Sequence, residues 1–280
     1  MSAEPPPEGR RRRRSAAWIV LLAGLAVLAV VGIVTTRRGG DKTPTNTAPT
    51  QIRLTVPEGM RREDVAALVQ QKTGLPGAAY LAATAPGVRG KRLAGAGRPT
   101  SLEGFLFPDT YFVDKTTTVA DIVNRQLAAY RQNVGGVDMR AAAAKNLTPF
   151  DVLTIASMVE REVQVPSERP IVAGIIYNRL HRRMRLDIDA TVQYAVGSWR
   201  PLTAKDLTVD SPYNTRRFPG LPPGPIASPG LASIQAAAHP KANDYLYYVA
   251  RNDGSGRHYF ATNQEQFLQL QEKARANGGG

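Results

Sequence analysis

The chain has 280 residues, 42% of them hydrophobic, a net charge of +13 and no cysteine. The lack of cysteine excludes disulfide scaffolds, thiolate metal sites, Fe–S clusters and cysteine nucleophiles. The three histidines lie far apart, and the sequence has neither an H-E-x-x-H motif nor a G-x-x-x-x-G-K-[ST] loop. We therefore expect no metal and no cofactor. The length allows one large domain or two small ones, plus a tail.

Residues 16–34 form an apolar run without a charge, long enough to span about 28 Å of bilayer. Five arginines at 10–14 precede it, and only Arg37 and Arg38 follow closely. The positive-inside rule then predicts a cytoplasmic tail at 1–14, a single transmembrane helix at 15–36 and an extracytoplasmic remainder. A cleaved signal peptide is the alternative, although its apolar core usually has only about 7–15 residues. Either interpretation exports the main body and argues against a nucleic-acid partner.

The exported part begins with a polar, proline-containing stretch at 37–50, which predicts a flexible linker. Alternating apolar residues then predict a strand at 52–56, and Pro57-Glu58-Gly59 predicts a turn. Helical spacing follows at 61–72, closed by Gly74, and again at 77–83. Residues 87–98 are rich in Gly, Arg and Lys and predict a loop. Residues 51–100 are expected to form a small subdomain.

A larger domain is expected over residues 101–275. The dense apolar residues of 102–111 predict burial, and 118–132 has the pattern of an amphipathic helix. Near the C-terminus, 244–250 predicts a strand with 258–260 as its partner. The fold class predicted for the exported part is therefore α+β.

The helix predicted over 148–163 carries the most informative carboxylates. Thr148, Pro149 and Asp151 make a strong helix start, with a capping box. On the helical wheel Arg161 points to water, whereas Glu160 and Glu162 lie on opposite margins of the apolar face. A partly desolvated carboxyl has a raised pKa, which suits a general acid. The alternative is that both are solvated and pair with arginines, and the wheel does not choose between them.

A second helix is predicted from Ser167, as its cap, to about 184, and a rigid Gly- and Pro-rich loop at 220–226. Together the segments resemble the YceG-like family, of the endolytic murein transglycosylase type. Nine collinear segments carry this resemblance: LEGFLFPDTY (102–111), IASMVERE (155–162), SER (167–169), IIYNRL (175–180), MRLDIDATVQYA (184–195), SPYNT (211–215), GLPPGPIASPG (220–230), AAAHP (236–240) and YLYYVA (245–250). The strand, Pro-x-Gly turn and helix at the start of 51–100 resemble a LysM-like module.

The resemblance implies that Glu160 is the catalytic residue, as the first glutamate of the family's V-E-x-E segment. It also implies a set of residues near the glycan: Glu162, Glu168, Tyr177, Asn178, Arg179, Asp189, Thr191, Tyr213, Asn214 and Thr215. Two positions depart from the family pattern. Ala190 stands where the family often has proline, so that turn is expected to be looser. Gln266 or Phe267 stands where a histidine is common.

The reaction that the resemblance implies is cleavage of the β-1,4 bond between N-acetylmuramic acid and N-acetylglucosamine inside peptidoglycan strands, leaving 1,6-anhydro ends. The chain would sit in the cytoplasmic membrane, with peptidoglycan as substrate and peptidoglycan synthases (penicillin-binding proteins) as possible partners. Two alternatives remain open. One is a muramidase that uses Asp187, Asp189 or Glu162 as a second carboxylate, and the other is a non-catalytic protein that binds the cell wall.

Overall fold

The computed structural model describes residues 51–94 and 101–278. In these residues the chain is mixed α+β, as predicted, with helices in the majority and two separate strand pairs. The tail, transmembrane helix and linker predicted over 1–50 lie outside the described residues and stay predictions. Among the residues that are described, no helix combines the length and the hydropathy needed to cross a bilayer.

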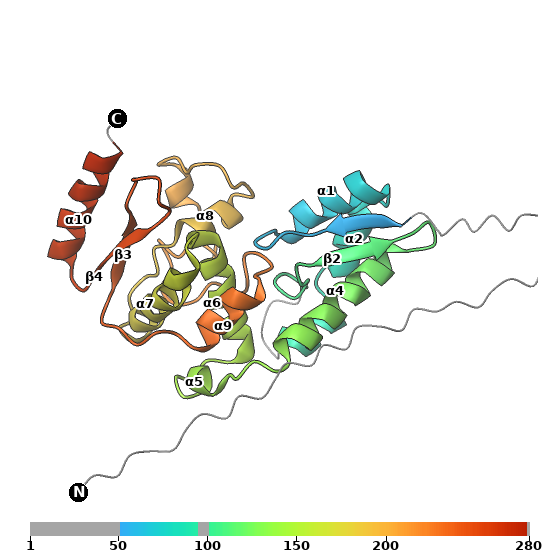
Figure 1. The fold of residues 1–280 in the computed structure, drawn as a ribbon, viewed down its shortest axis with the longest axis horizontal. Coiled ribbons are helices and arrows are strands. Elements are labelled where there is room, and N and C mark those ends of the chain that lie inside the picture. Colours follow the sequence, from blue (N-terminus) through green and yellow to red (C-terminus); the bar gives the residue numbers. More distant parts are fainter. Residues whose placement is uncertain (1–50, 95–100, 279–280) are drawn as a thin grey trace, which may run out of the picture. The chain divides into compact units, whose positions relative to one another are not determined.

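The first strand pair joins β1 (Ile52–Thr55) to β2 (Thr110–Val113) in antiparallel register, with Leu54 opposite Tyr111. Between and after these strands lie α1 (Arg62–Thr73), α2 (Gly77–Thr84), α3 (Val88–Ala94) and α4 (Val119–Val134). α1 packs on α2, and α2 packs on α4 (Figure 1). The strand predicted at 52–56 and the helices predicted at 61–72, 77–83 and 118–132 are confirmed. The boundary at residue 100 and the LysM-like character stay predictions.

The loop predicted at 87–98 is wrong over its first half, because residues 88–94 form α3. The loop prediction rests partly on Gly90, which lies inside this helix. One glycine costs only about 1 kcal/mol in a helix, and the arginine, lysine and leucine around it are good helix formers.

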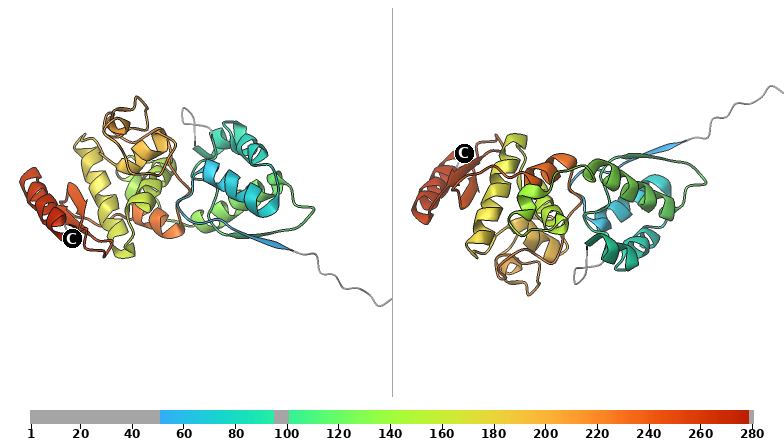
Figure 2. Two further views of the ribbon diagram at one scale, coloured as in Figure 1. Left: turned by 90° about the horizontal axis from the view of Figure 1, so that it is seen from above. Right: turned by 90° about the horizontal axis from the view of Figure 1, so that it is seen from below.

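The second part of the fold is built around α6 (Pro149–Glu162), which packs against α7 (Arg169–His181) and α9 (Leu231–Ala238). Both views of Figure 2 show these three helices side by side. The shorter elements around them are α5 (Arg140–Ala143), η1 (Pro166–Glu168), α8 (Asp189–Ala195) and η2 (Asp206–Thr208). α6 is buried continuously from Phe150 to Val159, so it forms the centre of the core.

The start of α7 differs from the prediction. Ser167 does not cap it, because residues 166–168 form the 3₁₀ turn η1 and the helix begins at Arg169. The N-cap residue is Glu168, whose side chain makes no capping hydrogen bond there. That carboxylate binds elsewhere, as described below, and Pro170 supplies the first-turn signal instead.

The C-terminal strand pair joins β3 (Tyr247–Ala250) to β4 (His258–Ala261), as predicted, and α10 (Gln264–Asn277) packs on both strands. Tyr247 stacks on Phe267, with ring centroids 5.1 Å apart. Phe267 is one of the two residues at the position where the family commonly has histidine. The other, Gln266, accepts hydrogen bonds from Thr262.

The burial predicted for 102–111 is confirmed, since Leu102, Phe105 and Leu106 are all buried. Phe105 stacks on Phe150 of α6 at 6.0 Å between centroids. This segment also buries Glu103, whose Oε2 accepts hydrogen bonds from the Arg62 backbone N–H at 3.2 Å and the Tyr194 hydroxyl at 3.3 Å. Its Oε1 is buried with no hydrogen-bond partner among the described residues. Burial raises the pKa of Glu103 to about 8.

Glu103→Gln is therefore expected to reduce the loss of stability between pH 5 and pH 8. In the wild type the folded chain holds a proton on Glu103 in this range, whereas the unfolded chain releases it, so folding stability falls as pH rises. Glutamine keeps an acceptor for both donors and does not titrate. Thermal unfolding at both pH values should show a wild-type decrease larger by roughly 5 °C than that of the variant. Equal decreases would contradict this role of Glu103.

Candidate active site

Strong local signals fix the start of α6, the helix that carries Glu160 and Glu162. The predicted capping box is present: the Asp151 N–H donates to Thr148 Oγ1 at 3.2 Å, and the Thr148 N–H donates to Asp151 Oδ2 at 2.8 Å. Pro149 occupies the first turn. The helix therefore begins where the sequence predicts, and Glu160 and Glu162 lie in its last turn.

Glu160 lies near the C-terminus of α6, and its side chain is only 8% exposed. Its Oε2 accepts a hydrogen bond from the Gly230 N–H at 3.1 Å, and its Oε1 lies 3.6 Å from Nη2 of Arg169. Gly230 is the N-cap of α9, so the positive end of that helix faces the carboxyl. Glu160 is thus a largely desolvated carboxyl, fixed by one N–H and one guanidinium.

The turn between β1 and α1 closes over this carboxyl. The Gly59 N–H donates to the Ser228 carbonyl, and the Ser228 N–H donates to the Met60 carbonyl, both at 2.8 Å. Gly59 has a φ of 77°, a conformation that favours glycine. Figure 1 shows this turn reaching the loop that precedes α9. Two segments about 170 residues apart in sequence are therefore joined beside Glu160.

Arg161 does not point to water, contrary to the prediction. Its guanidinium lies 3.9 Å from the centroid of the Trp199 ring, and its Nη1 donates to the Gly59 carbonyl at 3.2 Å. Burial lowers the pKa of Arg161. A helical wheel considers one helix alone. It therefore assigns this face to solvent, although residues 57–60 and Trp199 cover the face in the folded chain.

Glu162 points away from Glu160, into a different environment. It accepts hydrogen bonds from the Ala190 N–H at 3.2 Å and the Tyr248 hydroxyl at 3.3 Å. Burial raises its pKa. A proline in place of Ala190 would have no N–H to donate. The departure from the family pattern at this position therefore supplies one of the two hydrogen bonds that hold Glu162.

A cavity of about 560 Å³ brings together Glu162, Arg179 and Asp189 of the predicted set. Asp189 pairs with Arg216 at 2.6 Å. Asp187, which was a candidate second carboxylate, pairs with Arg179 at 3.2 Å in the same cavity. All three candidate second carboxylates thus line this cavity, whereas Glu160 faces Gly230.

Glu168 is buried in a pair with His258. Its Oε2 lies 2.8 Å from Nδ1 of His258 and accepts from the His258 backbone N–H at 3.1 Å. The pair ties the start of α7 to β4. A direct role for Glu168 at the glycan stays a prediction.

The residues predicted on α7 hold α9 and the segment between α9 and β3. The Tyr177 hydroxyl donates to the Ala237 carbonyl at 2.8 Å, and Asn178 Nδ2 donates to the carbonyls of Asn243 and Tyr245 at 2.8 and 2.9 Å. Arg179 is buried and donates to the carbonyls of Leu246, Arg185 and Leu186.

The remaining predicted residues lie around α8 and η2. Thr191 and Thr215 are buried and share a hydrogen bond at 2.9 Å, and Asn214 donates to the carbonyls of Leu207 and Val209. The Tyr213 ring lies 4.8 Å from that of Tyr194. These contacts order the loops near α8. Direct binding of glycan by these four residues stays a prediction.

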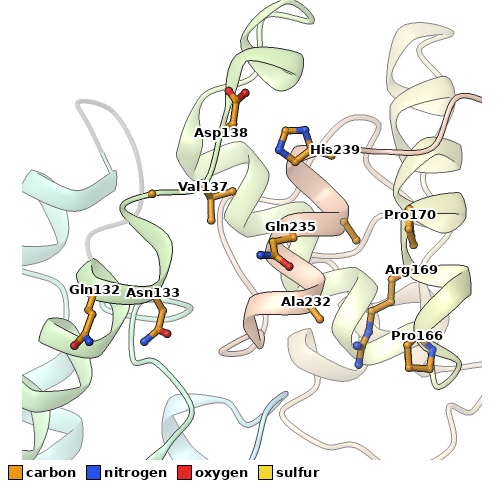
Figure 3. Close-up of a pocket in the computed structure, with 12 residues that line it drawn as sticks. Gln132, Asn133, Val137, Asp138, Pro166, Arg169, Pro170, Ala232, Gln235 and His239 are labelled. Atoms are coloured by element: carbon orange, nitrogen blue, oxygen red, sulfur yellow. The ribbon is translucent and has the colours of Figure 1, made fainter. Parts of the chain in front are cut away.

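Arg169 connects Glu160 to a cavity of about 640 Å³. Its polar lining comes from Gln132 and Asn133 of α4 and from Asp138 on one side, and from Gln235 of α9 and its C-cap His239 on the other, as Figure 3 shows. Amide, imidazole and guanidinium groups are suitable hydrogen-bond partners for the hydroxyl and N-acetyl groups of a sugar.

Sequence reasoning missed three residues around Glu160. Arg169 and Gly230 contact its carboxyl, and the carboxyl of Glu58 lies against Gly230. The sequence predicts only a turn at Glu58, and loops that a rigid scaffold positions often carry functional residues. The described residues contain no cluster of three or more His, Cys, Asp or Glu side chains that could hold a metal ion. What the site offers is a fixed carboxyl beside positive potential and a polar cavity, which is an arrangement for acid–base chemistry.

Comparison with known proteins agrees with the sequence resemblance. A model of the YceG-like family matches residues 35–273. Endolytic murein transglycosylases of Streptococcus pneumoniae (strain ATCC BAA-255 / R6) and Bacillus subtilis (strain 168) are 34% identical over 253 residues and 41% identical over 157 residues. These matches cover 82% and 55% of this chain, but only 45% and 43% of the relatives. The chain therefore spans less than half the length of the curated relatives it matches.

A solved structure supports the same assignment at the level of the fold. The crystal structure of a YceG-like protein from Listeria monocytogenes aligns with a TM-score of 0.71 at 31% identity, over 78% of this chain and 76% of that chain. Since the family model covers most of the sequence and the fold agrees, the chain belongs to the YceG-like family.

Proposed function

We propose that this chain is a membrane-anchored lytic transglycosylase that cuts the MurNAc-β-1,4-GlcNAc bond inside peptidoglycan strands and leaves 1,6-anhydroMurNAc ends. The observation that carries this proposal is the Glu160 carboxyl, 8% exposed and held by the Gly230 N–H and by Arg169. The names of the Streptococcus and Bacillus relatives support the reaction class.

The chemistry needs one proton donor that can also accept a proton. In the simplest scheme Glu160 protonates the leaving oxygen and then, as a carboxylate, removes the proton from the 6-hydroxyl of the same sugar. That hydroxyl closes on C1, so no water is consumed. Arg169 would orient the carboxyl, and the cavity lined by Gln132, Gln235 and His239 would hold a neighbouring sugar.

A muramidase is the second candidate, and its second carboxylate would have to act at the same sugar as Glu160. Asp187, Asp189 and Glu162 line the other cavity, and the first two are already paired with arginines. Their placement favours the transglycosylase. A wall-binding protein without catalysis has less support, because the V-E-x-E segment is intact at 159–162 and the relatives are named as endolytic murein transglycosylases.

The cellular context belongs to the same proposal. The apolar run at 16–34 would anchor the chain in the cytoplasmic membrane with its N-terminus inside the cell, and the site would face the nascent wall. The net charge of +13 suits an anionic wall and membrane surface. The 51–100 segment would act as the LysM-like subdomain beside the catalytic domain, and peptidoglycan synthases would be the protein partners.

Glu160→Gln is expected to abolish cleavage without loss of folding, because glutamine keeps the shape and the Gly230 hydrogen bond but has no acidic proton. Rates should fall by about 10²–10⁴-fold, the usual contribution of a general acid. Purified peptidoglycan is digested, and the fragments are read by mass spectrometry. Glu63→Gln is the matched control, since Glu63 is a surface residue of α1 with a 49% exposed side chain.

The end group of the products decides between the two enzymes. Anhydro ends from wild type and Glu63→Gln, and none from Glu160→Gln, are the expected result. Reducing ends, about 18 Da heavier by one water, would identify a muramidase. Cleavage retained in Glu160→Gln would contradict the assignment of Glu160.

Full-length chain expressed in a bacterium is expected to sediment with the membranes and to resist extraction by high salt, because a helix of about 19 apolar residues inserts stably. A chain that starts at residue 39 is expected to remain in the soluble fraction when made in the cytoplasm. The mass of the mature protein tests the signal-peptide alternative. A product that lacks the first 30 to 40 residues would contradict the uncleaved anchor.

A further inference from the structure

A second carboxyl approaches the candidate site from the β1–α1 turn. Glu58 is an exposed residue, and its carboxyl lies directly against the Cα of Gly230. A Cβ added to Gly230 would lie 1.9 Å from Oε1 and 2.1 Å from Cδ of Glu58. Since the N–H of the same glycine donates to Glu160, one residue separates the two carboxyl groups.

The backbone of the turn is fixed where Glu58 leaves it. The Gly59 N–H and the Met60 carbonyl are both paired with Ser228, and the Gly59 carbonyl accepts from Arg161. Glu58 therefore approaches Gly230 from an anchored backbone, which is what a residue acting at a defined atom requires.

The charged groups placed beside Glu58 come from two helices. Glu160 belongs to the end of α6 and Arg169 to the start of α7, and Arg161 binds the carbonyl of the neighbouring Gly59. Arg169 faces both carboxyls and lines the cavity of about 640 Å³. Partial burial raises the pKa of Glu58, an ionised Glu160 raises it further, and Arg169 lowers it. When Glu160 carries the proton that the proposed step requires, its charge is absent and burial is the cause that still raises the pKa of Glu58. A carboxylate with a raised pKa is a stronger base than an ordinary one.

We propose that Glu58 is a second catalytic carboxyl, which takes the proton from the sugar 6-hydroxyl while Glu160 gives its proton to the leaving oxygen. The inference rests on the proposed transglycosylase function and divides between two residues the roles that the simplest scheme gives to Glu160 alone.

The step balances without water or a co-reactant. The bond from C1 to the bridging oxygen breaks, and the bond from C1 to O6 forms. The Glu160 proton goes to the bridging oxygen, which leaves as a hydroxyl, and the O6 proton goes to Glu58. Before the next turnover Glu58 must release its proton to solvent, and Glu160 must take one up from solvent.

The assignment makes a prediction about pH. The base must be ionised, so the rate rises with pH through the pKa of Glu58, which lies above that of an ordinary glutamate. Glu58→Gln should lower kcat by about 10²–10⁴-fold and remove this acidic limb of the pH–rate profile, while the few remaining products keep anhydro ends. Rates are measured from pH 4 to 9 on soluble, uncrosslinked glycan strands, with Glu63→Gln as the control of unchanged rate and profile.

Gly230→Ala is an independent test that leaves both glutamates in the sequence. The φ of −73° at this position suits alanine, and the N–H remains available to Glu160. The new methyl group would displace the Glu58 carboxyl. The variant should therefore show the same decrease in kcat and the same loss of the acidic limb of the pH–rate profile as Glu58→Gln. Circular dichroism and glycan binding confirm that each variant is folded. If Glu58→Gln does not fold, Gly230→Ala decides alone.

Three outcomes would overturn the inference. A Glu58→Gln rate within threefold of wild type would show that Glu160 performs both transfers. A large loss of rate with the acidic limb intact would make Glu58 a positioning residue only. A wild type that binds glycan strands and never cuts them would overturn the proposed function as well, which separates that failure from the first two.

Discussion

The reciprocal pairing of the β1–α1 turn with Ser228 is the contact on which the candidate site depends. Two backbone hydrogen bonds at 2.8 Å join Gly59 and Met60 to a loop about 170 residues later in the chain. Each is worth only about 0.5–1.5 kcal/mol net, so the pair needs support. Arg161 provides it by stacking on Trp199 and binding the Gly59 carbonyl, and the β1–β2 ladder holds the other end of the turn. The β1–α1 turn, which is distant from α6 in sequence, therefore helps to shield Glu160 from water.

Among residues 51–94 and 101–278, four glutamates are largely withdrawn from water, and their partners suit them to different tasks. Glu103 binds two donors and leaves one oxygen without a partner, which favours a proton there. Glu168 is held by His258, and Glu162 by Ala190 and Tyr248. Glu160 alone among the four lies between a helix N-cap and an arginine that reaches a polar cavity. Burial by itself thus does not distinguish Glu160, the proposed acid, from the other three glutamates, whereas its neighbours do.

Local signals allowed α6 to be predicted closely, because its capping box, first-turn proline and apolar face act within a few residues of each other. The same reasoning failed for Arg161 and missed Glu58, since both are decided by segments distant in the chain. Ser167 failed as a cap for a related reason: Glu168 binds His258, about 90 residues later, and the chain enters α7 through a 3₁₀ turn. The wheel could place Glu160 and Glu162 on opposite margins, but only the tertiary structure shows that one faces Gly230 and the other Tyr248.

Several short motifs of the chain have a structural use that requires no substrate. Asn178, Arg179 and Asn214 donate mainly to backbone carbonyls, so they order the segments around α7 and α8 as a capping residue orders a helix end. The groups nearest Glu160 come instead from loops and helix ends: Glu58 on a turn, Gly230 at an N-cap and Arg169 at the start of α7. A site assembled from such termini exists only when the elements are docked. Substitutions at the turn contacts of Gly59 or Ser228 would therefore disturb the site through its assembly, although neither residue carries chemistry of its own.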